Sequence, residues 1–253
     1  PEVVAPTPAP AKPTPAPSEA ATKPRYGGVL INVTYKDLHT FDAQRSTDRP
    51  VLYGLAAPIY SGIIQLDPMD QAKIIGDLAE RWEASPDGKV FTFYFRKGVK
   101  WHDGKPFSAD DAKFTLERMR NPPKGMPSPR QDAFAVVDDM QVPDSNTLKI
   151  VLKQPSASFL DMLATGWNIM LPRHLVEPLG GKEISRREFI GTGPFVFQEY
   201  VNGVSVEWAR NKDYFVPGRP YLDGMKLFIM PDSSARHAAF KTGKIHVTDL
   251  LGD

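Results

Sequence analysis

The sequence predicts an α/β fold with mixed sheets in two packed parts. Strand-like and helix-like segments are mixed along the chain, without the strict strand–helix–strand repeat of an all-parallel sheet. The chain has 253 residues, of which 41% are hydrophobic and 10% aromatic, so it can bury a core in one large domain or two smaller ones. No internal repeat is evident in the sequence.

The composition excludes several classes of function. The net charge is +1, so nothing points to nucleic acid or to an anionic membrane surface. The chain has no cysteine, which excludes disulfides, thiolate metal sites and cysteine nucleophiles. No run of about twenty apolar residues is present, so no segment is expected to span a bilayer. No signal peptide is visible, and because position 1 is Pro rather than Met, we interpret the chain as a processed or trimmed product.

The first 24 residues, PEVVAPTPAPAKPTPAPSEAATKP, are dominated by proline, alanine and threonine and have no apolar period. Each proline fixes φ and removes a hydrogen-bond donor, so we expect a disordered, extended linker over 1–24. One interpretation is a spacer that holds a folded domain away from a membrane anchor or wall. The other is a generic disordered tail.

Folded sequence is expected from Arg25. β-branched residues over 29–35 predict a strand, and apolar spacing over 50–64 predicts a helix. Residues 78–82 are expected to form a short apolar turn. Apolar and polar residues alternate strictly over 90–96, so we expect a strand with three phenylalanines on its core face. These are Phe91, Phe93 and Phe95.

The clearest helix signal begins at Ser108. Ser108 can cap the helix, Asp111 occupies the third helical position, and Phe107 can pack onto Ala112 as a hydrophobic staple. The helix is expected to stop before the prolines at 122–123. Further elements are expected in this order: strands at 135–141 and 147–153, and short helices at 156–164 and 172–179.

The last part of the chain predicts a hairpin, a strand and a helix. Residues 191–194 form a tight loop, and Asn202-Gly203 is a two-residue turn between strands at 195–201 and 204–210. The elements expected after the hairpin are a strand at 222–230, a helix from Asp232 or Ser233 through Phe240, and a strand at 245–247.

No catalytic constellation is visible. His102 and Asp103 could bind metal or act as a base, but no further ligand falls at suitable spacing, which favours a polar turn. Residues 191–193 precede a proline and a strand instead of a helix, so they do not fit a phosphate loop. The sequence has no G-x-S-x-G elbow and no H-E-x-x-H motif. A hydrolase is therefore disfavoured, and we expect no enzyme, no cofactor and no bound metal.

Two loops are candidates for contacts with a small ligand. Residues 42–50, DAQRSTDRP, form a polar loop after the first expected strand, where open α/β sheets commonly bind ligands. Trp167 lies in a loop beside Gly166. An aromatic side chain there either lines a ligand cleft or packs in the core.

Two long stretches carry the most specific pattern in the chain. The first is LAERWEASPDGKVFTFYFRKGVKWHDG at 78–104, and the second is GTGPFVFQEYVNGVSVEWARNKDY at 191–214. Together they resemble the extracellular solute-binding proteins of the peptide/nickel/oligopeptide class, family 5, which deliver ligands to ATP-binding-cassette (ABC) importers. The resemblance covers the chain from Arg25 onward. It departs from the family pattern at Ala43, where a proline is usual, and at His246, where an acid is usual.

The resemblance implies the type II fold of periplasmic binding proteins, in which two hinged lobes trap a ligand. It implies a near lobe from 25–66 and 190–253, with an inserted subdomain from 67–189. The chain ends where members of the family cross to the far lobe, so we interpret it as an N-terminal half with the far lobe missing. One lobe alone is expected to bind ligand weakly and to expose an apolar patch.

The resemblance also implies a function. We expect a non-catalytic substrate-binding component of an importer, with peptides as the default ligand and nickel chelates, oligosaccharides or opines as alternatives. The expected partners are this ligand and ABC permease subunits in the membrane, and the full-length protein is expected to be a monomer. We expect a periplasmic or extracellular location, with the linker as a route to a membrane anchor. The alternative is a receptor subunit that senses ligand and signals without transport.

The resemblance also implies which residues of the near lobe face the ligand, judged by their place along the family's fold. These residues are Thr47, Asp48, Arg49, Trp167, Asn168 and Asp249. The first three follow the first strand, and the last lies at the expected crossing to the far lobe. Backbone groups of an extended peptide could pair with this wall as an added strand.

Overall fold

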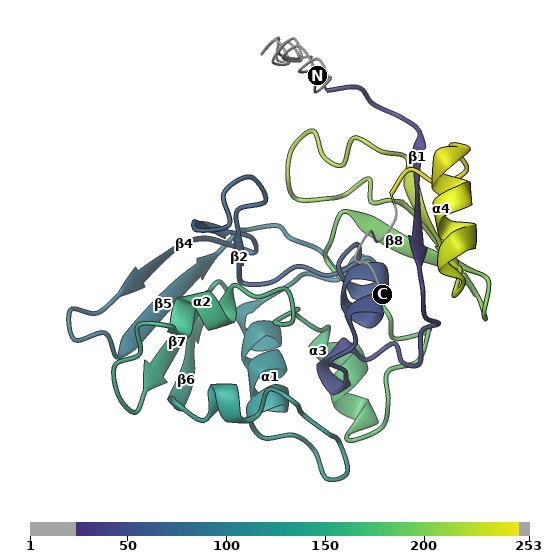
Figure 1. Cartoon of the computed structure of the whole chain (residues 1–253). Helices are drawn as coiled ribbons and strands as arrows, with labels where there is room; N and C mark the ends of the chain where they lie inside the picture. The colour runs from purple at the N-terminus through teal and green to yellow at the C-terminus, as the bar shows by residue number, and fades with distance from the viewer. Residues whose placement is uncertain (1–23, 248–253) are drawn as a thin grey trace, which may run out of the picture.

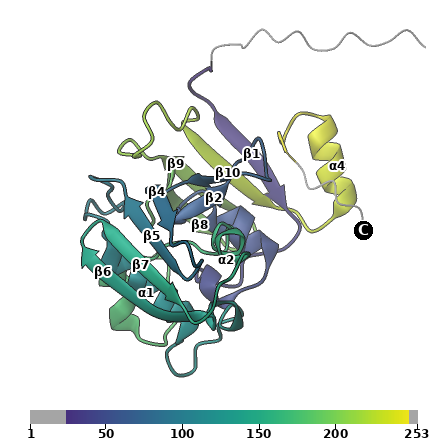
Figure 2. The same ribbon diagram turned by 90° about the vertical axis from the view of Figure 1, so that its left-hand side faces the viewer.

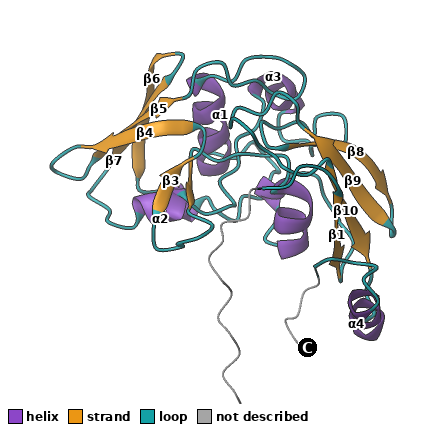
Figure 3. Cartoon of the chain, turned by 90° about the horizontal axis from the view of Figure 1, so that it is seen from above, coloured by secondary structure: helices purple, strands orange, loops and turns teal. Residues whose placement is uncertain are grey.

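The computed structural model describes residues 24–247. Asp249 lies outside this range, and so does the expected linker over 1–24 except for Pro24. The described residues form two parts that lie side by side, each built around its own sheet (Figure 1). Seen from above, the two sheets stand at opposite ends with helices between them (Figure 3). The α/β class with mixed sheets is confirmed.

The first sheet joins distant segments of the chain. Its strands, in spatial order, are β1 (Val29–Thr34), β10 (Gly224–Ile229), β9 (Ser205–Arg210) and β8 (Phe195–Val201). β1 runs parallel to β10, while the other neighbours pair antiparallel. Figure 2 shows β1 beside β10 at the edge of this sheet. The hairpin expected around Asn202-Gly203 is therefore confirmed as β8 and β9.

The second sheet is antiparallel throughout. Its strands, in spatial order, are β4 (Ala79–Ala84), β5 (Val90–Phe95), β7 (Thr147–Leu152) and β6 (Val137–Asp144). The turn expected at 78–82 is wrong, because this segment pairs along β5 as an edge strand. A separate two-stranded sheet consists of β2 (Ile64–Leu66) and β3 (Ile74–Gly76).

The phenylalanine strand and the capped helix agree with the sequence. The three phenylalanines of β5 are buried in one core with α1 (Ala109–Arg120). Ser108 and Asp111 form a capping box, in which the Ser108 N–H donates to Asp111 Oδ2 at 2.9 Å. The helix ends at Arg120, before the prolines, as expected.

The helix expected over 50–64 is shorter and of a rare type. η2 (Pro50–Ala56) is a π-helix, and the Ala57 N–H closes it by donating to the Leu52 carbonyl at 2.8 Å. The remaining helices are η1 (Ala43–Arg45), η3 (Asp132–Phe134), α2 (Phe159–Leu163), α3 (Arg173–Val176), η4 (Glu177–Leu179) and α4 (Ser233–Lys241). Within residues 24–247, none of the helices has the length and apolar character needed to cross a bilayer.

The end of the described chain lies against β1. Asp232 caps α4, as expected, and its side chain accepts the Ala235 N–H at 2.6 Å. The strand expected at 245–247 is wrong, because only His246 bonds to β1 and no ladder forms. The His246 N–H donates to the Ile31 carbonyl at 2.8 Å, and His246 Nδ1 accepts the Ile31 N–H at 3.1 Å.

Two large hydrophobic cores follow the two sheets. The core of the second sheet draws its buried residues from positions 63–170. The core of the first sheet includes Leu171, Val176, Ile184 and Phe189 together with residues of β8, β9 and β10. The division into a near lobe and a subdomain at 67–189 stays a prediction. In the structure, the packing changes from one core to the other at 169–171.

The glycine loop at 191–193 joins the two parts. A Cβ on Gly191 or Gly193 would stand 2.0 or 2.5 Å from the Ile59 carbonyl oxygen, so only glycine permits this approach. The Gly193 N–H donates to that oxygen at 2.6 Å. The Gly191 N–H donates to His102 Nδ1 at 3.3 Å, and His102 Nε2 donates to the Gly193 carbonyl at 3.1 Å. The imidazole thus bridges the two ends of the loop as a neutral ring.

Candidate ligand-binding site

A pocket of about 360 Å³ opens where β1 ends and η2 begins. Its lining is mainly apolar, with Arg49 as the charged residue. The lining residues are Asn32, Val33, Thr34, Tyr35, Arg49, Pro50, Tyr53, Gly54, Leu227 and Val247. An apolar recess with a few polar groups is the usual form of a small-molecule site, so this pocket is the first candidate.

The π-helix shapes one wall of this pocket. Tyr53 points outward and is 65% exposed, an unusual position for a large aromatic side chain. A Cβ on Gly54 would stand 2.9 Å from a Leu227 methyl group, so glycine lets the helix lie close to β10. π-helical turns occur often at functional sites. The rare helix type therefore coincides with an exposed aromatic side chain and a recess.

The three consecutive residues expected to contact ligand have different surroundings. Arg49 is exposed and lines the pocket, and Thr47 is exposed. Asp48 is partly buried, and its Oδ2 lies 2.6 Å from Lys36 Nζ and 3.2 Å from His39 Nδ1. The hydrogen bond from Lys36 holds the pKa of Asp48 below its usual value. Of the three, Arg49 has the side chain best placed to meet a ligand in the pocket.

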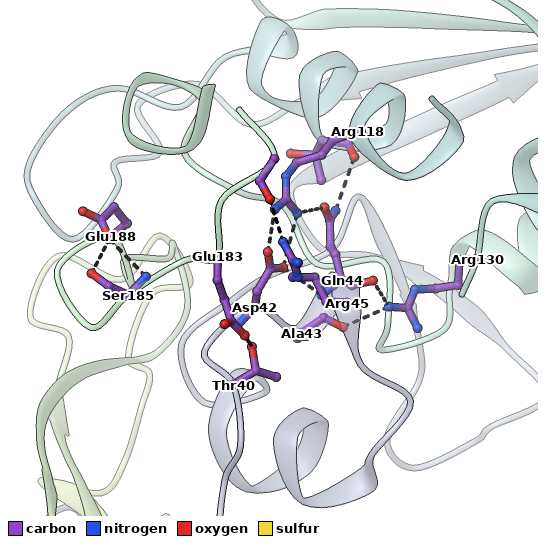
Figure 4. Close-up of polar contacts among 12 residues, drawn as sticks. Thr40, Asp42, Ala43, Gln44, Arg45, Arg118, Arg130, Glu183, Ser185 and Glu188 are labelled. Carbon is purple, nitrogen blue, oxygen red and sulfur yellow. Dashed lines mark hydrogen bonds and ion pairs between the residues drawn. The ribbon is translucent and has the colours of Figure 1, made fainter. Parts of the chain in front are cut away.

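A buried ion pair fixes the base of this loop (Figure 4). Arg118 of α1 donates to Asp42 Oδ2 at 2.5 Å and to Gln44 Oε1 at 2.6 Å. The Arg118 and Asp42 side chains are 2% and 0% exposed. Burying two charges is costly unless they are paired and hydrogen-bonded, as these are. The pair therefore ties the loop firmly to α1 at the point where the chain turns toward Arg49.

Arg130 connects the same loop to the predicted aromatic contact. Its guanidinium donates to the carbonyls of Ala43 at 2.9 Å, Gln44 at 2.7 Å and Ser46 at 3.1 Å. Its Cζ also lies 4.9 Å from the centroid of the Trp167 ring. Burial lowers the pKa of Arg130, while the charge of Asp42 acts in the opposite direction. Arg130 thus brings together the loop at 43–46 and Trp167, two candidates that lie far apart in the sequence.

Asn168 has a clear structural role. It is buried, and its Nδ2 donates to the Met162 carbonyl at 2.6 Å and to Thr165 Oγ1 at 3.0 Å. These bonds close the end of α2. Trp167 is half-buried beside it. Ligand contact by Thr47, Asp48, Arg49, Trp167 and Asn168 stays a prediction, and Asp249 lies outside the described residues.

His102 and Asp103 contact different partners in the structure. The Asp103 carboxylate lies 2.7 Å from His174 Nε2, while the His102 ring bonds the glycine loop. Burial lowers the pKa of His102, partly offset by its bond to Gly193. Among the residues from 24 to 247, no group of three or more His, Asp or Glu side chains is placed to hold a metal ion. The geometry fits the polar turn.

Comparison with known proteins identifies the family. The sequence model of the bacterial extracellular solute-binding proteins, family 5, middle region, matches residues 73–252. The dipeptide-binding protein of Escherichia coli is 30% identical over 225 residues, which cover 82% of this chain and 42% of that protein. Di/tripeptide-binding protein 2 of Pseudomonas aeruginosa is 33% identical over 215 residues, covering 78% of this chain and 40% of that protein.

A solved structure has the same fold. The ABC transporter-associated periplasmic binding protein DppA of Helicobacter pylori, in complex with the peptide STSA, superposes with a TM-score of 0.80 at 29% identity. The match covers 88% of this chain and 47% of that one. This chain therefore spans less than half the length of these relatives. The resemblance drawn from 78–104 and 191–214 is confirmed: the chain belongs to family 5 of the bacterial extracellular solute-binding proteins.

Proposed function

We propose that this chain supplies one wall of the substrate-binding component of an ABC importer, which captures peptides outside the cytoplasmic membrane. The pocket at the end of β1 carries the proposal, because it combines an apolar lining, an exposed aromatic side chain and Arg49. The relatives named as dipeptide- and di/tripeptide-binding proteins support peptides as the ligand.

The pocket has features that suit a short peptide. β1 is an edge strand of its sheet, and His246 bonds this edge at Ile31. The residues that follow Ile31 in β1 line the pocket, so an extended backbone can lie alongside them. Among the described residues, no carboxylate forms an ion pair with Arg49. A guanidinium binds a carboxylate through paired hydrogen bonds, so Arg49 suits the C-terminal carboxylate of a peptide or an acidic side chain.

A binding experiment tests this assignment. The chain is titrated with alanyl-alanine, trialanine and the C-terminal amides of both, while the backbone resonances of Asn32–Tyr35 and Tyr53 are followed by NMR. Because the recess is open, we expect a dissociation constant of about 1 mM or weaker for the free peptides. Arg49→Ala should weaken binding of the free acids but not of the amides, whereas Arg187→Ala, a change at another exposed arginine, should alter neither.

Two results would contradict the proposal. One is the absence of any saturable shift at the pocket with all four ligands. The other is equal binding of acids and amides in the unmodified chain, which would remove the role assigned to Arg49. Peptides recovered unchanged after long incubation are the expected sign of a non-catalytic binding protein.

The proposed location and partners follow from the family. A periplasmic or extracellular location is expected, with ABC permease subunits as partners in the membrane and the 1–24 segment as a route to an anchor. The receptor alternative has no supporting observation, since the relatives described above are named as binding proteins.

A further inference from the structure

A second, smaller cavity lies between η2, the β2–β3 sheet and the end of α2. Its volume is about 130 Å³, and none of its lining residues belongs to the first pocket. The residues that line it are Ala57, Tyr60, Gly62, Ile64, Gln65, Asp77, Ala164, Thr165, Gly166, Asn168 and Ile169. The lining contains a carboxylate but no lysine or arginine.

Asn168 offers an unpaired acceptor at this cavity. Its Oδ1 is buried and has no hydrogen-bond partner among the described residues. The amide group is not free to turn over, because its Nδ2 is committed to the Met162 carbonyl and to Thr165 Oγ1. A buried acceptor without a donor is costly. Because Asn168 lines the cavity, a donor bound there could satisfy this oxygen.

Asp77 supplies a carboxylate to the lining of the same cavity. It is 9% exposed, and its Oδ2 accepts the Gly62 N–H at 2.8 Å. Gly62 also adjoins Asn168, since a Cβ on Gly62 would stand 3.4 Å from the Asn168 carbonyl oxygen. Gly62 therefore lies beside both residues, and both line the same cavity. Gln65, half-buried in β2, lines the same space.

Among the described residues, no lysine, arginine or histidine forms an ion pair with the Asp77 carboxylate. The nearby cation is Arg96, whose Nε donates to the Asp77 backbone carbonyl at 2.8 Å and whose Cζ lies 5.9 Å from the Phe215 ring centroid. Burial raises the pKa of Asp77 to about 7, against the lowering effects of the Gly62 hydrogen bond and the Arg96 charge. Burial, and after it the charge of Asp77, raises the pKa of the Tyr214 phenol. A cation in the cavity would compensate the buried carboxylate directly.

We propose that this cavity binds a primary ammonium group, with Asp77 as the counter-ion and the side-chain oxygens of Asn168 and Gln65 as further acceptors. An ammonium group carries three N–H donors and no acceptor, which matches this set. Divalent metals favour several carboxylates or imidazoles, and no such group exists within residues 24–247. The inference stands apart from peptide capture, because it uses a different cavity and its probe is not a peptide.

Methylammonium chloride is the probe that tests this site. The 253-residue chain is titrated while the backbone amide of Gly62 and the side-chain amide of Asn168 are followed by NMR. We expect saturable shifts with methylammonium and none with equal concentrations of tetramethylammonium, which has no N–H. Asp77→Asn keeps an acceptor for Gly62 and should raise the dissociation constant at least about tenfold. Asp138→Asn, at an exposed carboxylate, should leave it unchanged.

A cavity-filling variant provides a second test that leaves Asp77 intact. Ala57 lines the cavity and is exposed, so Ala57→Leu should block the opening without disturbing the core. It should abolish the methylammonium shifts, while Ala133→Leu, at another exposed alanine, should not. Failure of both cavity variants to weaken binding would overturn the proposal. So would saturation by potassium at the same concentrations, or a response to methylammonium that never saturates.

Discussion

At the scale of single residues, Asp77 is a carboxyl whose ionisation opposes folding. Burial raises its pKa from 3.8 to about 7, so between these pH values the folded chain holds a proton that the unfolded chain has released. Stability therefore falls as pH rises through this window. The loss is complete above the folded pKa.

Asp77→Asn should reverse this loss. The variant removes the ionisation and retains an acceptor for the Gly62 N–H. We expect its free energy of unfolding to exceed that of the unmodified chain by up to about 4 kcal/mol at pH 8.5, with a smaller difference at pH 5. Urea unfolding at the two pH values measures this. A difference that does not change with pH would contradict the assignment.

The Arg118–Asp42 pair permits a second prediction at this scale. Arg118→Met leaves the fully buried Asp42 carboxylate without its cation, so we expect a loss of about 3–5 kcal/mol in the free energy of unfolding. Arg120→Met is the matched control. Arg120 is partly exposed and pairs with Glu117 at 3.1 Å, so its loss should be about 1 kcal/mol or less. Urea unfolding measures both losses. Equal losses would show that the buried pair contributes no more to the free energy of unfolding than the exposed pair does.

The sequence indicates some of the residues that line or support the candidate site, but not others. Arg49 and Trp167 could be proposed as ligand contacts because polar loops after strands and aromatic residues beside glycine are local patterns. Their contact with ligand stays a prediction. Arg118 and Arg130 were missed, since each acts on residues far away in the sequence. The sequence does not distinguish a buried arginine in a helix from a surface arginine. Arg118 reaches Asp42 only because the fold brings the two residues together.

At the scale of elements, the bond between His102 and the glycine loop makes the junction sensitive to acid. The ring accepts the Gly191 N–H at Nδ1, so protonation would place an N–H against an N–H. Burial lowers the pKa of His102 below 6.5. The unfolded chain then binds the proton more readily, and stability is lost as pH falls below the unfolded pKa.

His102→Asn should make stability less dependent on pH between 7 and 5. The substitution is expected to destabilise the chain at pH 7, where the neutral imidazole bridges the loop, and to cost less at pH 5. Thermal unfolding across this pH range measures the difference. A His174→Asn variant, which removes the partner of Asp103 and not the loop bridge, serves as the control. A cost that is constant across the range would refute the role given to His102.

Elements defined by local chemistry were predicted best. The capping box at Ser108, the alternation in β5 and the turn at Asn202-Gly203 each specify their structure within a few residues. The segment at 78–82 was misjudged because its strand character depends on pairing with β5. The π-helix was expected to be an ordinary helix, since apolar spacing does not distinguish a π-turn from an α-turn.

At the scale of the whole molecule, the family and the fold class were accessible from two stretches of sequence, while the site was not. Residues 78–104 and 191–214 are largely framework: a strand pair, a bridging turn, a glycine loop and a hairpin. Such framework residues form recognisable sequence patterns because the same packing requires the same types of side chain. The cavity walls instead combine β1, η2, the end of α2 and single residues of β10, and no local pattern connects these segments.

Because β1 pairs in parallel with β10, it also determines when the first sheet can form during synthesis of the chain. Val29 leaves the ribosome well before its partner Gly224 is made. The core built from 63–170 is contiguous and can form while synthesis continues. β1 must wait unpaired through that interval, with its apolar residues exposed. The nascent chain is therefore most vulnerable to misassembly just before β10 emerges, when one core is complete and the first sheet still lacks its second strand.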